Sequence, residues 1–169
     1  MIDDAFRTAR LSAERLTEAH YDDLRVFHQD TQMMAMIGGL RDAAGTVAYL
    51  DRHLLQWHRH GFGFFLLRDV ATGAAAGTAG LRWIKLGEDV DVEVGYGFLP
   101  AYWGRGLGTE IADACVALAF DKLAAPSVLA LTHHGNSASQ HVLEKVGLTY
   151  ERDAEVEGRM AMLYRGVRP

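Results

Sequence analysis

The spacing of hydrophobic residues changes part-way along this chain. Up to residue 60, apolar side chains recur every three or four positions, which is the spacing of one helix face. This spacing predicts a short helix after Thr17 and a second helix over residues 46–60, which Gly61 ends; the loop "MIGGL" separates the two. The apolar stripe expected on the second helix consists of Val47, Leu50, Leu54 and Trp57.

After residue 61 the period shortens to two. The segments "FGFFLLRDV", "GTAGLRWIKL" and "DVDVEVGYGF", separated by short turns, predict three antiparallel strands in a meander. A helix then begins near Leu107, followed by a buried strand over residues 127–132, a helix over residues 136–146 and two paired strands. This order of elements predicts a mixed α/β (α+β) fold around one central sheet.

Composition narrows the class of protein. The chain has 169 residues, of which 49% are hydrophobic and 23% are charged, so we expect one globular domain over residues 1–169. Its first residues show no apolar run of signal-peptide length, and no segment is long enough to span a membrane. Cys115 is the only cysteine, so we expect a cytoplasmic protein with a buried thiol on a helix stripe.

The charges argue against two classes of partner. The formal net charge is −5 and the basic residues are scattered, which argues against a nucleic-acid partner. His58 and His60 lie two apart on a helix, and His133 and His134 are adjacent in the chain, so neither pair converges on one metal ion. We therefore expect no metal site.

Three alternating glycines mark the most distinctive segment, "YGFLPAYWGRGLGTEIADACVALAF". Gly104, Gly106 and Gly108 expose main-chain N–H groups where a helix begins, a place that suits an anion such as a pyrophosphate. A sharp strand-to-helix turn is the alternative reading of the same glycines. The spacing matches neither a dinucleotide fingerprint nor a P-loop.

With "NSASQHVLEKVGL" some thirty residues later, this segment resembles the GCN5-related N-acetyltransferase (GNAT) superfamily, and within it the RimJ/RimL-type branch. The coenzyme A loop of that superfamily, [Q/R]-x-x-G-x-[G/A], falls on residues 103–108, with Trp103 replacing glutamine or arginine. The resemblance covers nearly the whole chain. It implies a twisted, mostly antiparallel sheet of six or seven strands flanked by four helices, with two strands that splay apart to admit acetyl-CoA.

The resemblance also implies which residues contact the cofactor. The strand over residues 90–98 and the strand over residues 127–132 would be the splayed pair, with coenzyme A held mainly by the main chain between them. The implied cofactor-binding residues are Phe98, Leu99, Trp103, Gly104, Arg105, Gly106, Leu107, Gly108, Thr109 and Asn136.

Two side chains are candidates for proton transfer. Alternation along "VDVEVGYGF" places Glu93 on the same face as Gly95 and Gly97, and strand glycines often mark a close approach, so Glu93 would border a groove. In similar enzymes a glutamate there deprotonates the amine; a solvated carboxylate is the alternative. Asn136 suits a helix N-cap, and the resemblance makes Ser139 the proton donor to the thiolate.

The function implied is acetyl-CoA-dependent N-acetylation of a primary amine by direct attack in a ternary complex. The acceptor is left open between a protein N-terminus and a small amine, and the candidates for contacting it are Gly38, Gly39 and Trp83. A catalytically weak acyl-CoA-binding or sensing module is the alternative. The sequence does not distinguish a monomer from a homodimer.

Overall fold

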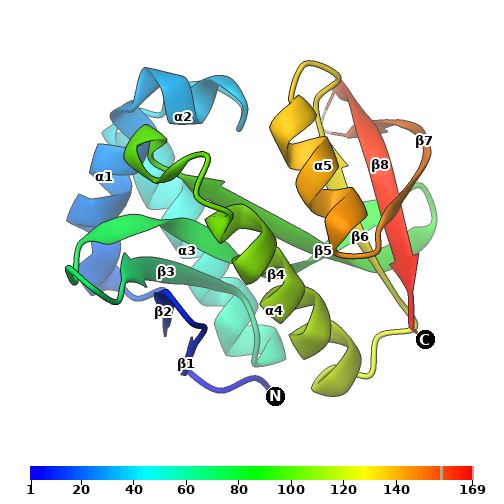
Figure 1. Ribbon diagram of the computed structural model, residues 1–169, viewed down its shortest axis with the longest axis horizontal. Helices are drawn as coiled ribbons and strands as arrows, with labels where there is room; N and C mark the ends of the chain where they lie inside the picture. Colours follow the sequence, from blue (N-terminus) through cyan, green and yellow to red (C-terminus); the bar gives the residue numbers. More distant parts are fainter. Residues whose placement is uncertain (157, 169) are drawn as a thin grey trace.

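One twisted sheet organises the molecule (Figure 1). The structure is a computed structural model that describes residues 1–156 and 158–168. Its strands are β1 (Ala5–Arg7), β2 (Leu11–Arg15), β3 (Phe64–Asp69), β4 (Ala75–Leu86), β5 (Asp89–Phe98), β6 (Ser127–Thr132), β7 (Thr149–Val156) and β8 (Arg159–Val167). Within the described residues their order is β1-β2-β3-β4-β5-β6-β8-β7. All neighbours are antiparallel except β5 and β6.

Helices cover both faces of this sheet. They are η1 (Glu18–His20), α1 (Tyr21–Gln29), α2 (Thr31–Ala35), α3 (Ala43–His60), η2 (Pro100–Tyr102), α4 (Leu107–Asp121) and α5 (Ser137–Lys145), where η denotes a 3-10 helix. In Figure 1, α4 and α5 lie on the near side of the sheet and α3 lies on the far side. We call the near side the α4 face and the far side the α3 face.

The predicted fold class is confirmed, with small differences in element number. The described residues form eight strands rather than six or seven, because the N-terminal segment folds into the β1–β2 hairpin in which Phe6 pairs with Ala13. An additional short helix, α2, lies between the first predicted helix and the expected loop "MIGGL". Its N-cap is Asp30, whose carboxylate accepts a hydrogen bond from the Met33 N–H, so α2 is separated from α1.

The second predicted helix is rotated relative to the expected stripe. Its buried residues are Thr46, Leu50, His53 and Trp57. Val47 was predicted to be buried, and this is wrong, since Val47 is 46% exposed. The rotation has a physical cause: the Trp57 indole donates to the Phe64 carbonyl (2.9 Å), and buried Thr46 is hydrogen-bonded to His28 (2.9 Å). The stripe therefore includes a histidine that hydrophobic spacing alone did not indicate.

Separate apolar clusters pack on the two faces of the sheet. On the α4 face, Leu107, Ile111 and Cys115 are fully buried, which confirms the predicted buried thiol; burial raises the pKa of Cys115 to about 12. On the α3 face, Leu24 and Leu50 belong to a second cluster under α1 and α3. No helix among the described residues has the length and apolar character needed to cross a membrane.

Strands β5 and β6 splay apart, as the resemblance implies for this pair of strands. β4 and β5 pair along their whole length, from Leu86–Asp89 to Gly77–Phe98. β5 and β6 pair only at Val92–Val128 and Glu93–Leu129. The remainder of β5, from residue 94 to residue 98, therefore diverges from β6, and the gap begins immediately after Glu93.

Candidate functional site

The loop from β5 to α4 consists largely of exposed main chain. β5 ends at Phe98, Pro100 begins the short η2 turn, and Leu107 is the first buried residue of α4. Gly104 and Gly106 have φ angles of 69° and 74°, a left-handed conformation that glycine adopts without strain. A Cβ atom added at Gly104 would meet no protein atom within 4 Å. The loop thus presents bare main chain to open space.

The N-terminus of α4 is left open by this loop. Its N-cap is Gly106, and no described side chain caps the helix. The Gly106 carbonyl accepts its helical bond from the Glu110 N–H (3.1 Å), which leaves the N–H groups of Leu107, Gly108 and Thr109 without an intrahelical acceptor. These donors and the positive end of the helix dipole suit an anion, so the residues present fit the pyrophosphate of coenzyme A.

A residue distant in sequence holds the glycine loop in place. The Arg10 guanidinium donates to the Arg105 carbonyl (2.6 Å) and to the Glu110 carboxylate (2.7 Å). Burial opposes ionisation of Glu110, but hydrogen bonds from Thr8 and Arg10 outweigh it and hold the pKa of that carboxyl below its ordinary value. The sequence analysis missed Arg10, because nothing in the spacing of residues 8–10 relates them to residues 105–110.

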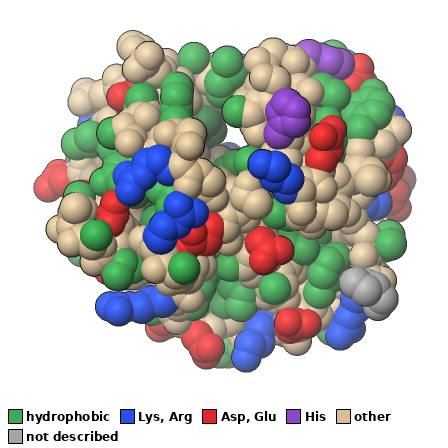
Figure 2. All heavy atoms as spheres, viewed as in Figure 1, with side chains coloured by type: hydrophobic (Ala, Val, Ile, Leu, Met, Phe, Trp, Pro, Cys, Tyr) green, Lys and Arg blue, Asp and Glu red, His purple; other side chains and the backbone are tan. Residues whose placement is uncertain are grey.

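Trp103, the departure from the superfamily pattern, has a structural role in the same loop. Its indole N–H donates to the Phe98 carbonyl (2.8 Å), although 49% of the residue is exposed. This bond ties the loop back to the end of β5. Figure 2 shows basic side chains gathered over this part of the α4 face and a narrow opening between the loop and α5.

A hydroxyl pair lies on the α4 face. Asn136 caps α5, because its side-chain oxygen accepts from the Ser139 N–H (3.1 Å). The Ser139 hydroxyl is 3.0 Å from the Tyr96 hydroxyl of β5. Burial raises the pKa of Tyr96 to about 12, so its phenol keeps its proton at neutral pH. β5 and α5 are thus linked across the gap by a predicted proton donor and a tyrosine that the sequence analysis did not select.

On the α3 face, Glu93 forms an ion pair with Arg82. The Arg82 Nε donates to a Glu93 carboxylate oxygen, and Glu93 is 7% exposed. The alternative of a solvated edge carboxylate is therefore wrong, and the carboxylate lies at the point where β5 leaves β6.

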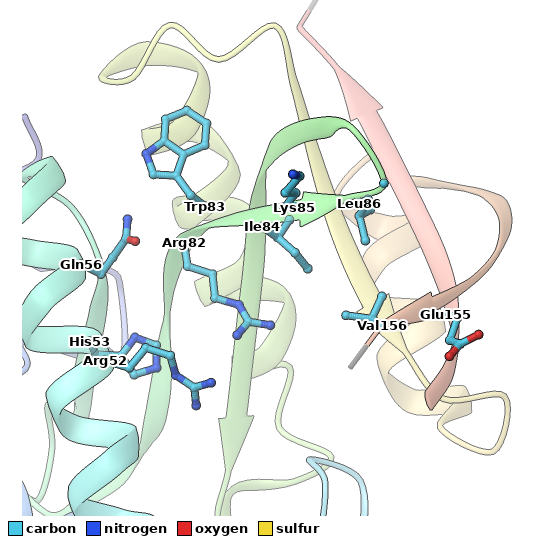
Figure 3. A pocket seen from close by; sticks show the side chains of 11 residues that line it. Arg52, His53, Gln56, Arg82, Trp83, Ile84, Lys85, Leu86, Glu155 and Val156 are labelled. Atoms are coloured by element: carbon cyan, nitrogen blue, oxygen red, sulfur yellow. The ribbon is translucent and has the colours of Figure 1, made fainter. Parts of the chain in front are cut away.

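A cavity adjoins this ion pair. It has a volume of about 380 Å³ and lies between α3, the end of β4 and β7. Arg82, Ile84 and Leu86 of β4 line one wall, and Arg52 and His53 of α3 line another (Figure 3). The volume is in the range of small-ligand sites. Among the described residues, no three histidine, cysteine or carboxylate side chains converge as a metal site would require.

Comparison with known proteins identifies the family. A family model of the acetyltransferase (GNAT) domain matches residues 10–149. The chain belongs to the GNAT family. The resemblance to this family is thereby confirmed, and the protein is a GNAT acetyltransferase.

Individual relatives agree with this assignment. The curated protein YkkB of Bacillus subtilis is 28% identical over 123 residues, which are 73% of this chain and 72% of YkkB. An acetyltransferase structure from Agrobacterium tumefaciens has a TM-score of 0.86 at 26% identity and covers 99% of this chain and 96% of its own. RimL, a ribosomal L7/L12 α-N-protein acetyltransferase solved in complex with coenzyme A, shares the fold: TM-score 0.79, 14% identity, coverage 96% and 97%.

The glycine face of β5 in this GNAT protein is filled by its own side chains. A Cβ atom at Gly95 would lie 2.9 Å from the Phe64 ring, and one at Gly97 would lie 2.5 Å from Ile37. The sequence analysis expected a close approach at these glycines, and the structure has one. The groups that approach are the side chains of Phe64 and of Ile37, which follows α2. The cavity on this face lies further along, beside Arg82, the ion-pair partner of Glu93.

The predicted acceptor-contacting residues lie at two separate places. Gly38 and Gly39 follow α2 with φ angles of 105° and 90°, and the Gly38 carbonyl accepts from Arg159 of β8 (3.2 Å). Trp83 lines the rim of the cavity, is 41% exposed and packs edge-on against Phe62. The structure does not bring the glycines and Trp83 together, and their contact with an acceptor stays a prediction.

Proposed function

We propose that this GNAT acetyltransferase transfers the acetyl group of acetyl-CoA to a primary amine by direct attack in a ternary complex. The observation that carries the proposal is the gap between β5 and β6. It begins at Glu93 on the α3 face and lies beside the uncapped start of α4 and the Ser139 hydroxyl on the α4 face. Cofactor and acceptor can thus approach one point from opposite faces of the sheet.

The cofactor side is proposed to act through main chain. Acetyl-CoA supplies an acetyl group already activated as a thioester. The N–H groups of Leu107, Gly108 and Thr109 are proposed to bind its pyrophosphate, with Trp103, Gly104, Arg105 and Gly106 forming the wall of the loop. The main chain of Phe98 and Leu99 and the side chain of Asn136 are proposed to hold the pantetheine arm.

Two side chains are proposed to take part in proton transfer. Glu93 removes a proton from the acceptor ammonium, directly or through a water molecule, and its ion pair with Arg82 fixes its orientation. Ser139 assists departure of the thiolate, while the Tyr96 phenol fixes the direction of its hydroxyl. Because a thiol has a pKa of about 8.5, the leaving group needs little help, and Ser139 should contribute less than Glu93.

Two acceptor classes are compatible with this site. A protein N-terminal α-amine is supported by the shared fold with RimL, which acts on such a group. A small-molecule amine is supported by the cavity of about 380 Å³ beside Glu93. Both classes present a primary amine to the same carboxylate.

The test is release of free coenzyme A from acetyl-CoA over a panel of amines, with the acetylated product identified by mass spectrometry. The panel contains amino acids, polyamines and short peptides with free N-termini, and reactions without amine correct for hydrolysis. Amine-dependent release by at least one acceptor is the expected result. Tight binding of acetyl-CoA without release for any amine would favour an acyl-CoA-sensing module instead.

A further inference from the structure

Three polar side chains of α3 line the wall of the cavity beside Glu93. They are Arg52, His53 and Gln56, and Arg52 and Gln56 lie one helical turn apart. His53 is 2% exposed, and its ring lies between those of Tyr49 and Phe64, tilted to both, at centroid distances of 4.4 Å each. This packing restricts the orientation of an imidazole that lines the cavity.

Two of these side chains carry buried polar atoms without a partner. Within residues 1–156 and 158–168, the His53 Nδ1 and Gln56 Nε2 atoms are buried and have no hydrogen-bond partner. A buried polar atom without a partner destabilises the protein, and a hydrogen bond to a ligand in the cavity would remove that cost. The Gln56 amide nitrogen can only donate, and the Arg52 guanidinium can only donate, so both require an acceptor atom.

The charges around the cavity favour a single negative charge. The Arg82 charge is balanced by Glu93 within their ion pair. Figure 3 shows Val156 turned toward the cavity and Glu155 turned to the other side of β7, as strand alternation requires. Among the described lining residues outside the ion pair, Arg52 and Lys85 are positive and Glu155 is negative, which leaves one net positive charge. Arg52 supplies the positive charge on the α3 wall. His53 adds none, because burial, with Arg52 and Arg82 nearby, lowers its pKa to about 3.

We propose that Arg52, His53 and Gln56 bind a carboxylate group of the acceptor, which is thus an amine with a carboxylate a few bonds from the reacting nitrogen. Arg52 forms the ion pair, Gln56 donates from Nε2, and neutral His53 donates from Nδ1. The apolar wall of Ile84 and Val156 covers the carbon chain of the acceptor. This inference rests on the proposed function, because it describes the acceptor of that same reaction.

Position along the sheet supports this arrangement. Arg82 lines the cavity and also pairs with Glu93 in the β4–β5 register, so the proposed carboxylate site and the proposed base share one wall. An acceptor whose carboxylate lies at Arg52 can therefore direct its amine toward Glu93. Free amino acids and protein N-termini with an acidic side chain both carry this chemistry.

The experiment compares matched amines that differ only in the carboxylate. One arm pairs amino acids with their carboxamides; the other pairs C-terminally amidated peptides that begin with Asp or Glu with the same peptides beginning with Asn or Gln. We expect kcat/KM to favour the carboxylate member by about tenfold or more, since a hydrogen-bonded charge contributes about that much. The arm with the larger preference identifies the source of the acceptor.

Variants of α3 test whether its side chains cause the preference for amines with a carboxylate. Arg52→Met is expected to lower the preference about tenfold, through a higher KM for the carboxylate member. Arg59→Met is the matched control, because Arg59 is an exposed arginine on the same helix outside the cavity lining, and it should retain the preference. Two results would overturn this inference while leaving the proposed function intact. One is acetylation of amines with equal kcat/KM for the two members of each pair, and the other is a carboxylate preference that Arg52→Met retains.

Failure of the proposed function has a different signature. If no amine is acetylated, binding of the same amino acids and carboxamides is measured by calorimetry with coenzyme A present. Carboxylate-selective binding by the wild type that is lost in Arg52→Met would then support the site by itself. Equal binding of both members, or no binding, would overturn it.

Discussion

The two faces of the sheet offer different kinds of site. On the α4 face, the predicted cofactor site is main chain: three alternating glycines and the open N-terminus of α4. On the α3 face, the cavity beside Glu93 is made of side chains from α3, β4 and β7, which are distant in the sequence. The comparison teaches that a main-chain site can be encoded in one short segment, whereas a side-chain cavity is assembled by the fold from distant segments.

The largest effect on rate should come from the α3 face. We expect Glu93→Gln to lower kcat/KM about a hundredfold at pH 7 for a lysine-like or polyamine acceptor, because a positioned base typically contributes 10² to 10⁴. An amine of pKa about 10.4 is nearly all protonated at that pH, so the loss should diminish as pH rises. For an α-amino group, with a pKa near 7.7 to 8.0, the loss should be smaller and should disappear at lower pH.

The control for this prediction is Asp91→Asn. Asp91 lies two residues before Glu93 on β5 and pairs with Arg165 (3.0 Å), so the variant also removes a carboxylate from an ion pair of the same strand. Profiles of kcat/KM against pH for wild type, Glu93→Gln and Asp91→Asn separate a base from a structural ion pair. Coincident profiles for wild type and Glu93→Gln would show that Glu93 is not the base.

A smaller effect is expected from the hydroxyl pair on the α4 face. Ser139→Ala should lower kcat about tenfold, because the thiolate is a tolerable leaving group without assistance. If Tyr96 acts through Ser139, Tyr96→Phe should lower kcat by less in the wild-type background and not at all in the Ser139→Ala background. Additive losses in this double-mutant cycle would show that Tyr96 acts independently, through its position beside Gly108.

The features that the sequence predicted are the local ones, such as the start and the cap of a helix. Gly104, Gly106 and Gly108 predicted the turn into α4 and its free N–H groups, because the start of a helix is a local feature. Asn136 predicted a helix cap for the same reason, and the structure confirms that cap. Hydrophobic spacing also predicted the β3–β4–β5 meander and the pairing of β7 with β8.

Features that depend on packing were not predicted. The burial of His53 follows from a rotation of α3 that the Trp57–Phe64 hydrogen bond sets, and apolar spacing does not encode that bond. The Arg10 contacts with Arg105 and Glu110 join segments about a hundred residues apart in the chain, and no local pattern connects them. The Arg82–Glu93 pair required the register of β4 against β5, which only the sheet fixes.

The two faces also differ in how acid affects their stability. Burial, with Arg41 and Arg25 nearby, lowers the pKa of His28 to about 4, and that of His53 is lowered to about 3. Both folded values lie below the ordinary 6.5, so the free energy of unfolding should be highest above pH 6.5 and decrease as pH falls toward 4. Each histidine contributes at most about 1.4 kcal/mol per pH unit in this window.

Thermal unfolding across this pH range provides the measurement. His28→Gln should give a shallower decrease of Tm between pH 6.5 and 4, and the exposed His58→Gln on α3 serves as the control. On the α4 face, Glu110 should act only at lower pH, because its pKa is held below its ordinary value and its stabilisation is lost as pH falls through that lowered pKa. An unchanged slope in His28→Gln would contradict the assignment of acid sensitivity to the α3 face.

The central claim, that bare main chain at the start of α4 holds acetyl-CoA, is tested most directly by calorimetric titration of acetyl-CoA into wild type, Gly106→Val and Gly87→Val. Gly106 and Gly87 have φ angles of 74° and 64°, so valine imposes similar backbone strain at both; Gly87 lies in the β4–β5 turn, at the opposite end of β5 from the loop. With folding of all three proteins verified by thermal unfolding, we predict wild-type affinity for Gly87→Val. Affinity should be at least about a hundredfold lower for Gly106→Val, because several hydrogen bonds to a charged group are lost together. Wild-type affinity in a folded Gly106→Val protein would contradict the account.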